Sequence, residues 1–228
     1  MIDTNTHIIN GVDNGCKDYN DAGKVVLKAK NEGVTTMFVT PHQGVDSKFD
    51  ADELKLRFKK FSDIFKKYEI DMYLGAEIEY HKDCLVKVFY KKLLTMNNTK
   101  FVLMDFTATK DDFYDIPTVV REYKAHGFSI IVAHAEKLGL TDREYLKIKN
   151  AGAYFQVDVQ SLYDKKYKKT MDYLIEERLV DFVSTSIHSS TNPYLMEKAY
   201  KDLLKKTNKD YTDLIFNRNP KNFLILGK

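Results

Sequence analysis

The sequence predicts an α/β protein whose parallel strands close into a distorted (β/α)7, TIM-like barrel. Short apolar runs alternate with longer stretches of helical periodicity from one end of the chain to the other, and no Pro-, Gly- or Ser-rich linker interrupts them. Parallel neighbouring strands need crossover connections, and helices then cover the sheet. At 228 residues, a single domain spanning 1–228 is long enough for such a barrel.

Seven runs are the expected strands, because short apolar segments bounded by turn residues are typical of buried parallel strands. An open doubly wound sheet is the alternative, but its Gly-x-Gly-x-x-Gly turn after the first strand is absent, and Gly11 and Gly15 bracket three other residues instead. We therefore favour the barrel. The expected strands are Ile2–Ile9, Thr35–Thr40, Met72–Ile78, Phe101–Phe106, Ser129–His134, Ala153–Val159 and Phe182–His188.

Helices are expected between these strands, where apolar side chains recur every three or four residues. One stripe runs from Ala22 to Ala29, a second from Leu54 to Tyr68 and a third from Tyr167 to Leu179. Such a stripe buries one face of a helix against the sheet. Core packing explains all three.

Charge and cysteine content exclude several classes of protein. Lys and Arg total 36 against 33 Asp and Glu, and both signs are spread along the chain, which argues against a nucleic-acid groove. Cys16 and Cys84 form no Cys-x-x-Cys pair, and the first residues lack the pattern of a signal peptide. No window approaches the roughly 20 apolar residues of a membrane span. We expect a cytoplasmic protein without direct membrane insertion.

Four of the six histidines lie at or just beyond the end of an expected strand, namely His7, His42, His134 and His188. A barrel gathers these carboxyl ends into one mouth, which is the rim that carries chemistry in (β/α) barrels. The other two, His81 and His126, fall in helical or loop surroundings. Convergence of the four is the argument, because a single histidine at a strand end is more often structural.

Carboxylates occupy similar places. Glu77 and Asp105 each sit in an otherwise apolar strand, where an ionised carboxylate is costly unless it is paired or binds a cation. Imidazoles combined with carboxylates suit manganese, iron or zinc. Asp158 alternates with Gln156 and Gln160, so this polar face lines the barrel interior or forms a hydrogen-bonded structural row.

Two other catalytic arrangements lack their signature. Neither Cys16 nor Cys84 is followed six residues later by the arginine of a cysteine-dependent phosphatase loop; Ala22 and Tyr90 stand there. No Gly-x-Ser-x-Gly elbow is present for a serine hydrolase.

Five motifs, in order, resemble those of the polymerase and histidinol phosphatase (PHP) superfamily. Within it they resemble the manganese-dependent protein-tyrosine phosphatases of bacterial capsule and exopolysaccharide operons, and the Gly-x-Asp-x-Gly turn points to that branch. The motifs are Met1–Gly15, Thr40–His42, Gly75–Ile78, Ala133–Lys137 and Ser184–His188.

The resemblance implies three divalent metals at the strand ends of a seven-stranded barrel, and it implies hydrolysis of phosphotyrosine. It also implies a catalytic role for Glu136 and Lys137, where Lys137 replaces a substrate-binding arginine as a point charge without a bidentate fork. The implied metal ligands are His7, His42, Glu77, His134 and His188, with Asp105 where the family usually has Glu.

Several positions depart from the family pattern. Asn5 stands in place of a histidine, while Asn14 and Ser186 each stand in place of an aspartate; Gln43 follows His42 where a second histidine is common. Losses among the metal ligands should weaken binding by more than the roughly 10–100-fold typical of changes in groups that only support a ligand. We therefore expect fewer than three ions.

Three hypotheses follow. The first is a metal-dependent protein-tyrosine phosphatase, slowed by the lost ligands, acting on a phosphotyrosine protein such as the tail of a bacterial tyrosine kinase. The second is a weakly active or inactive PHP-fold protein that binds such a partner without turnover. The third is a hydrolase for a small phosphoester.

Overall fold

The computed structural model describes residues 1–107 and 115–227. Every paired strand is parallel to its neighbour, in one sheet of order β1-β2-β4 and a second of order β3-β5-β6-β7-β8-β9. The strands are β1 Ile2–Thr6, β2 Thr36–Val39, β3 His42–Gln43, β4 Asp71–Leu74, β5 Glu77–Glu79, β6 Phe101–Asp105, β7 Ser129–Val132, β8 Tyr154–Asp158 and β9 Phe182–Ser184.

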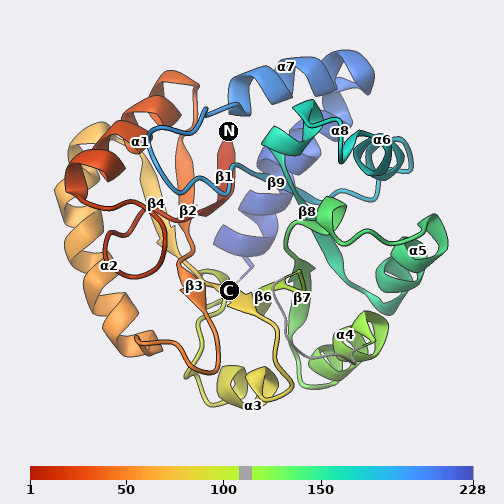
Figure 1. Cartoon of the computed structure of the whole chain (residues 1–228), viewed down its shortest axis with the longest axis horizontal. Coiled ribbons are helices and arrows are strands. Elements are labelled where there is room, and N and C mark those ends of the chain that lie inside the picture. The colour runs from red at the N-terminus through yellow and green to blue at the C-terminus, as the bar shows by residue number, and fades with distance from the viewer. Residues whose placement is uncertain (108–114, 228) are drawn as a thin grey trace.

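Helices surround the strands, which lie in the middle of the molecule (Figure 1). Within residues 1–107 and 115–227, no helix is long and apolar enough to cross a membrane. The α-helices are α1 Tyr19–Asn31, α2 Ala51–Phe65, α3 Cys84–Phe89, α4 Ile116–Ala125, α5 Asp142–Ala151, α6 Lys168–Glu176, α7 Met196–Lys206 and α8 Lys209–Asp213.

The two sheets together form at least half of a barrel. Two residues separate β2 from β3, and two separate β4 from β5, so the same two chain segments continue from the first sheet into the second. Beyond the ends of β1 and β9, Thr6 pairs with Ile187 in an isolated parallel bridge, and the His7 amide donates to the Ile187 carbonyl at 2.9 Å.

Alternation along the strands separates two cores. On β6, Val102 and Met104 pack in the large cluster beneath the surrounding helices, whereas Phe101 and Leu103 belong to a smaller cluster on the opposite face of the strands. Asp105 follows in that second row. The strand therefore begins apolar on this face and ends with a buried carboxylate.

The chain's last helical turns close the apolar end of this face. They run over Leu214–Arg218 and Pro220–Ile225, and Leu224 packs in the smaller cluster with Phe38, Phe101 and Phe182. The Asn97 side-chain amide donates to the Leu224 carbonyl at 2.9 Å. One end of the strand array is therefore filled by apolar groups, which leaves polar chemistry to the other end.

Most expected elements are present with altered bounds. The stripes predicted for three helices correspond to α1, α2 and α6, and the predicted strands begin within two residues of observed ones. The single strand expected over Met72–Ile78 is wrong, because Gly75 and Ala76 separate β4 from β5. The short β3 was not expected. The strand expected over Phe182–His188 ends at Ser184, because Ser186 has left-handed backbone, with φ of 46°.

Gly75 marks the break because its backbone passes close to a buried side chain. A Cβ at this position would lie 2.6 Å from Met96 Sδ and 3.3 Å from Thr40 Cγ2. We predict that Gly75→Ala destabilises the fold by about 1–3 kcal/mol, since Met96 is fully buried and must shift. Urea unfolding measures the change, and Gly44→Ala, whose nearest contact is 3.8 Å, is the matched control. Equal urea midpoints for the two variants would contradict the conclusion that the Gly75 backbone passes too close to Met96 for a Cβ.

Candidate metal centre

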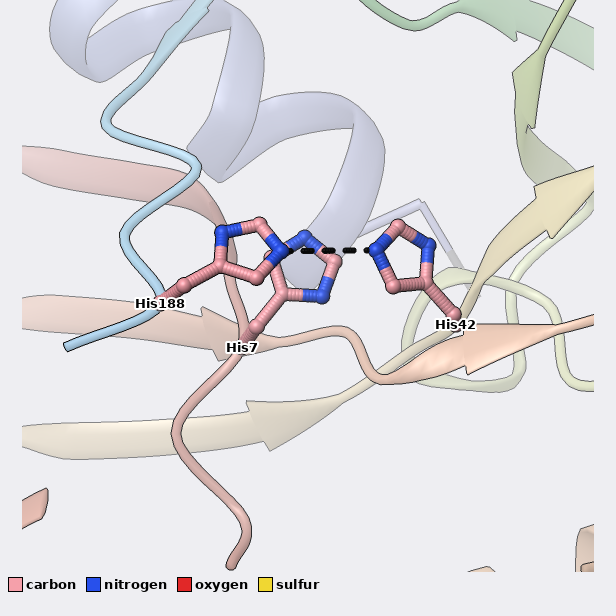
Figure 2. A group of neighbouring side chains, drawn as sticks. All are labelled: His7, His42 and His188. Carbon is pink, nitrogen blue, oxygen red and sulfur yellow. Dashed lines mark hydrogen bonds between the residues drawn. The ribbon is translucent and has the colours of Figure 1, made fainter. Parts of the chain in front are cut away.

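Three imidazole rings meet where β1, β3 and the segment after β9 come together (Figure 2). The His7 ring stacks on His42 at 4.2 Å between centroids and on His188 at 4.1 Å. Nε2 of His42 and Nε2 of His188 lie 3.4 Å apart. One ligand atom from each of the three rings falls within 4.8 Å of the others, which is the spacing of a shared metal ion.

Asp13 fixes the orientation of His7. Its Oδ2 lies 3.1 Å from His7 Nδ1 and accepts the His42 amide at 2.9 Å, while its Oδ1 accepts the Gly15 amide at 2.9 Å. An Nδ1–H held by a carboxylate leaves Nε2 as the free nitrogen. His7 Nε2 is buried and makes no hydrogen bond within the described chain, although Glu77 Oε2 lies 3.5 Å from it.

The three rings differ in charge. Burial opposes the protonated form of His7, but the hydrogen bond to Asp13 and the negative charges of Glu77 and Asp13 outweigh it and raise the pKa of His7 to about 9. Burial and the charge of His7 lower the pKa of His42, and the same two causes lower the pKa of His188 to about 4. His42 and His188 are therefore neutral, which is the form that binds metals.

A second group comprises Glu77, Asp105 and His134, all buried, with one ligand atom from each again within 4.8 Å of the others. His134 Nε2 lies 3.1 Å from Glu77 Oε1. Burial disfavours the charged form of His134, but the charges of Asp158 and Glu77 raise the pKa of His134 well above its ordinary value. Asp105 Oδ1 accepts from the amide and hydroxyl of Thr107 at 2.6 and 2.7 Å.

Glu77 joins the two groups. Its Oε1 faces His134 and lies 3.5 Å from His42 Nδ1, and its Oε2 faces His7 and accepts the side-chain amide of Asn5. Burial opposes ionisation, but the charge of His134 and the surrounding hydrogen bonds hold the pKa of Glu77 well below its usual range. A buried carboxylate that stays ionised is suited to bind a cation.

The positions of Asn5 and Ser186 do not offer a third set of ligands. Asn5 Oδ1 accepts the Thr40 hydroxyl, and Asn5 Nδ2 donates to Glu77 Oε2, so an N–H group points at the carboxylate. The Ser186 hydroxyl donates to Asp158 Oδ1 at 2.6 Å. Ser186 Oγ also accepts from Asn5 Nδ2 at 3.3 Å, so hydrogen bonds within the protein engage both side chains.

Lys137 and Glu136 contact different groups of Asp158. Lys137 Nζ is 2.6 Å from Asp158 Oδ2, and its side chain is 31% exposed. Glu136 is buried, and its Oε1 accepts from the Ser161 hydroxyl at 2.6 Å and from the Asp158 amide at 3.3 Å. Burial and the charge of Asp158 raise the pKa of Glu136 to about 7. Lys137 thus contacts the Asp158 carboxylate, whereas Glu136 contacts the backbone amide of Asp158.

A cavity of about 600 Å³ opens beside the histidines. Lys137, Asp158 and His188 line it together with Asn14, which is exposed and lies outside both ligand groups. Its remaining walls are formed by Gln160, Ser161, Asp164, Tyr167, Thr185, Ser186, Ile187, Asn192 and Pro193.

The six residues expected to bind metal thus fall into two groups of three. Glu77 belongs to the second group and lies 3.5 Å from His7 and from His42 of the first. His81, on a loop after β5, and His126, at the end of α4, belong to neither group. Sequence reasoning missed Asp13, although its place in the Gly11–Gly15 turn directly after a strand was a usable signal.

A family model described as capsular polysaccharide synthesis, CpsB/CapC, matches residues 1–225. The chain belongs to this family. The tyrosine-protein phosphatase CpsB of Streptococcus agalactiae serotype V is 29% identical, over 98% of each chain. The tyrosine-protein phosphatase YwqE of Bacillus subtilis is 26% identical, over 83% of this chain and 78% of YwqE. The resemblance read from the motifs is therefore confirmed.

Solved structures share the fold. One from a study of YwqE from Bacillus subtilis and CpsB from Streptococcus pneumoniae, described as metal-dependent tyrosine phosphatases, has a TM-score of 0.89 at 21% identity and covers 100% of this chain and 95% of its own. The histidinol phosphate phosphatase of Lactococcus lactis has a TM-score of 0.62 at 13% identity, with 90% and 92% covered.

We predict that Asp13→Asn lowers the pKa of His7 in metal-free protein from about 9 toward or below its ordinary 6.5, because the carboxylate that stabilises the imidazolium is lost. Titration of the ring proton by NMR measures it. Asp115→Asn, which alters only the cap of α4, should leave the titration unchanged. A wild-type His7 that already titrates near 6.5 would show that Asp13 does not hold the proton.

Proposed function

We propose that this chain is a metal-dependent protein-tyrosine phosphatase that holds fewer than three ions. One observation supports the proposal above the rest: ionised, buried Glu77 lies between two groups of potential ligands, beside a cavity whose wall carries Lys137. Relatives along the whole chain are tyrosine-protein phosphatases. A phosphoryl group in the cavity would lie between these ligands and the lysine.

The donors present fit two ions. Imidazole nitrogens and carboxylate oxygens without thiolates suit manganese, and also iron or zinc. His7, His42 and His188 would hold one ion, with buried Nε2 of His7 as its deepest donor; Glu77, Asp105 and His134 would hold the other. Bound divalent ions supply charge stabilisation at the phosphoryl oxygens and activate water.

The chain's own groups would bind and orient the ester. Lys137 neutralises part of the phosphoryl charge as a single point charge. Tyr167 and Pro193 offer flat apolar surfaces on the cavity wall for an aryl ring. Glu136 would contribute indirectly, because it accepts a hydrogen bond of 3.3 Å from the backbone amide of Asp158.

The substrate we propose is a phosphotyrosine protein in the cytoplasm, with the tail of a bacterial tyrosine kinase as one candidate. An extended tail suits a cavity that is open to solvent. We further propose that both sheets belong to one PHP-type barrel domain of seven strand positions, in which β2 with β3 and β4 with β5 each count as one. The bridge between Thr6 and Ile187 supports closure.

A second candidate function has its own support. Two groups that could serve catalysis are engaged within the protein: Asn5 donates to Glu77, and Lys137 pairs with Asp158. A protein that keeps these pairs would bind a phosphorylated or unphosphorylated partner without turnover. Metal content and hydrolysis of an aryl phosphate separate the two functions.

We predict that the purified chain, equilibrated with manganese, binds fewer than three ions, because hydrogen bonds within the protein already engage Asn5 and Ser186. Elemental analysis measures the number. His134→Ala should lower it more than His81→Ala, since His81 lies in neither ligand group. Three tightly bound ions per chain would refute the proposal. Replacing Asn5→His, Asn14→Asp and Ser186→Asp together should raise the number.

We also predict that hydrolysis of an aryl phosphate requires metal and neither cysteine. Burial raises the pKa of Cys16 to about 12 and that of Cys84 to about 11, so neither is a thiolate at neutral pH. Chelation should therefore abolish the rate, and thiol alkylation should leave it within about twofold of untreated protein. A cysteine-dependent phosphatase treated in parallel controls for reagent potency. Loss of activity on alkylation alone would exclude the mechanism.

A further inference from the structure

Asp158 lies at the carboxyl end of β8 and receives four side-chain contacts. Its Oδ2 lies 3.0 Å from His134 Nδ1 and 2.6 Å from Lys137 Nζ. Its Oδ1 accepts from the hydroxyls of Ser184 at 3.0 Å and Ser186 at 2.6 Å. No other carboxylate in the described chain joins a member of a ligand group to the cation on the cavity wall.

These contacts argue against Asp158 as a replacement metal ligand. Both oxygens are already occupied by two donors each, and Asp158 belongs to neither group of converging ligand atoms. They also argue against a purely structural row of polar side chains. Ser184 and Ser186 could donate to an uncharged side chain, so these two hydrogen bonds alone would not require a buried carboxylate.

The contact with His134 determines which nitrogen is available. A carboxylate that accepts Nδ1–H leaves Nε2, 3.1 Å from Glu77, to face the metal group. Such carboxylate–imidazole pairs orient the ring and increase its basicity toward a metal, and their loss typically lowers metal affinity about 10–100-fold.

The contact with Lys137 opposes phosphate binding, whereas the contact with His134 favours metal binding. Both side chains line the cavity, so the ammonium group that a phosphoryl dianion would meet is already paired with a buried carboxylate. The carboxylate of Asp158, 2.6 Å from Lys137 Nζ, neutralises the positive charge of the lysine. A dianion must compete with Asp158 for this cation.

We propose that Asp158 is a positioning residue with two opposed effects: it orients His134 for metal binding and withholds Lys137 from a phosphoryl dianion. The second effect rests on the proposed function, because it assumes that phosphate enters this cavity. The first does not need phosphate.

The central experiment measures two affinities of Asp158→Asn by calorimetry. Manganese affinity, measured without phosphate, should fall about 10–100-fold, because His134 loses its charged partner. Affinity for inorganic phosphate, measured at saturating manganese, should rise about 3–10-fold, because hydrogen bonds from a charged donor are stronger once it is unpaired. Ser184→Ala, which removes one donor to Oδ1 and neither key contact, should change both by less than twofold.

The Lys137→Gln variant shows whether the expected rise in phosphate affinity depends on Lys137. In that background, Asp158→Asn should change phosphate affinity by less than twofold, whereas a gain that persists would reflect direct repulsion by Asp158 and overturn the withholding effect. Lys137→Gln alone should weaken phosphate binding by less than about threefold. A loss of phosphate affinity above tenfold would mean that Asp158 does not withhold Lys137 in the wild type. This measurement decides the point even if Asp158→Asn fails to fold.

A third measurement needs no metal. The rate at which an anhydride acylates Lys137, read by peptide mass spectrometry, should rise several-fold in Asp158→Asn and stay constant in Ser184→Ala. If the wild type binds no manganese, the proposed function fails while this test still decides whether Asp158 holds Lys137. If Asp158→Asn instead loses one whole ion at saturating manganese, Asp158 is a ligand and the positioning role is wrong.

Discussion

The buried negative charge of Glu77 is the constraint on which the rest of the site depends. A carboxylate with no solvent exposure stays ionised only if cations or strong donors surround it. His134 supplies these contacts from the carboxyl end of β7, and His7 and the amide of Asn5 supply them from the carboxyl end of β1. The positions of the imidazoles therefore follow from the need to satisfy Glu77, and a divalent ion would satisfy it in the same way that protonated histidines do in the metal-free chain.

The strands support this arrangement by changing character along their length. On one face they begin with apolar side chains, which Leu224 and its neighbours cover, and they end in buried polar groups. His134 and Ser186 both follow strand ends in left-handed backbone, with φ of 50° and 46°. Such conformations cost about 1–3 kcal/mol in residues other than glycine, so packing and hydrogen bonds must hold them. At these two positions the backbone turns a side chain toward a buried carboxylate, His134 toward Glu77 and Ser186 toward Asp158.

Local patterns made part of this predictable. Helical stripes and apolar runs depend on neighbouring residues, so α1, α2, α6 and the course of the strands could be read from the chain, and strand-end histidines could be expected to meet. The break at Gly75 could not, because it depends on Met96 from a different segment. Asp13 was missed for a related reason. Its value lies in bonds to His7 and to the His42 amide, and only the folded turn brings these together.

Asn5, Ser186 and Asp158 show how polar side chains at strand ends can satisfy one another through hydrogen bonds. An amide N–H at Asn5 points where a metal ligand would need a lone pair, and it stabilises Glu77 by donating to it. Ser186 carries no charge, yet Asp158 on the adjacent strand places a carboxylate within 2.6 Å of its hydroxyl. That carboxylate is contacted by four protein side chains. Hydrogen bonds within the protein thus engage Asn5, Ser186 and Asp158, while the histidines and carboxylates of the two groups hold their potential ligand atoms close to one another.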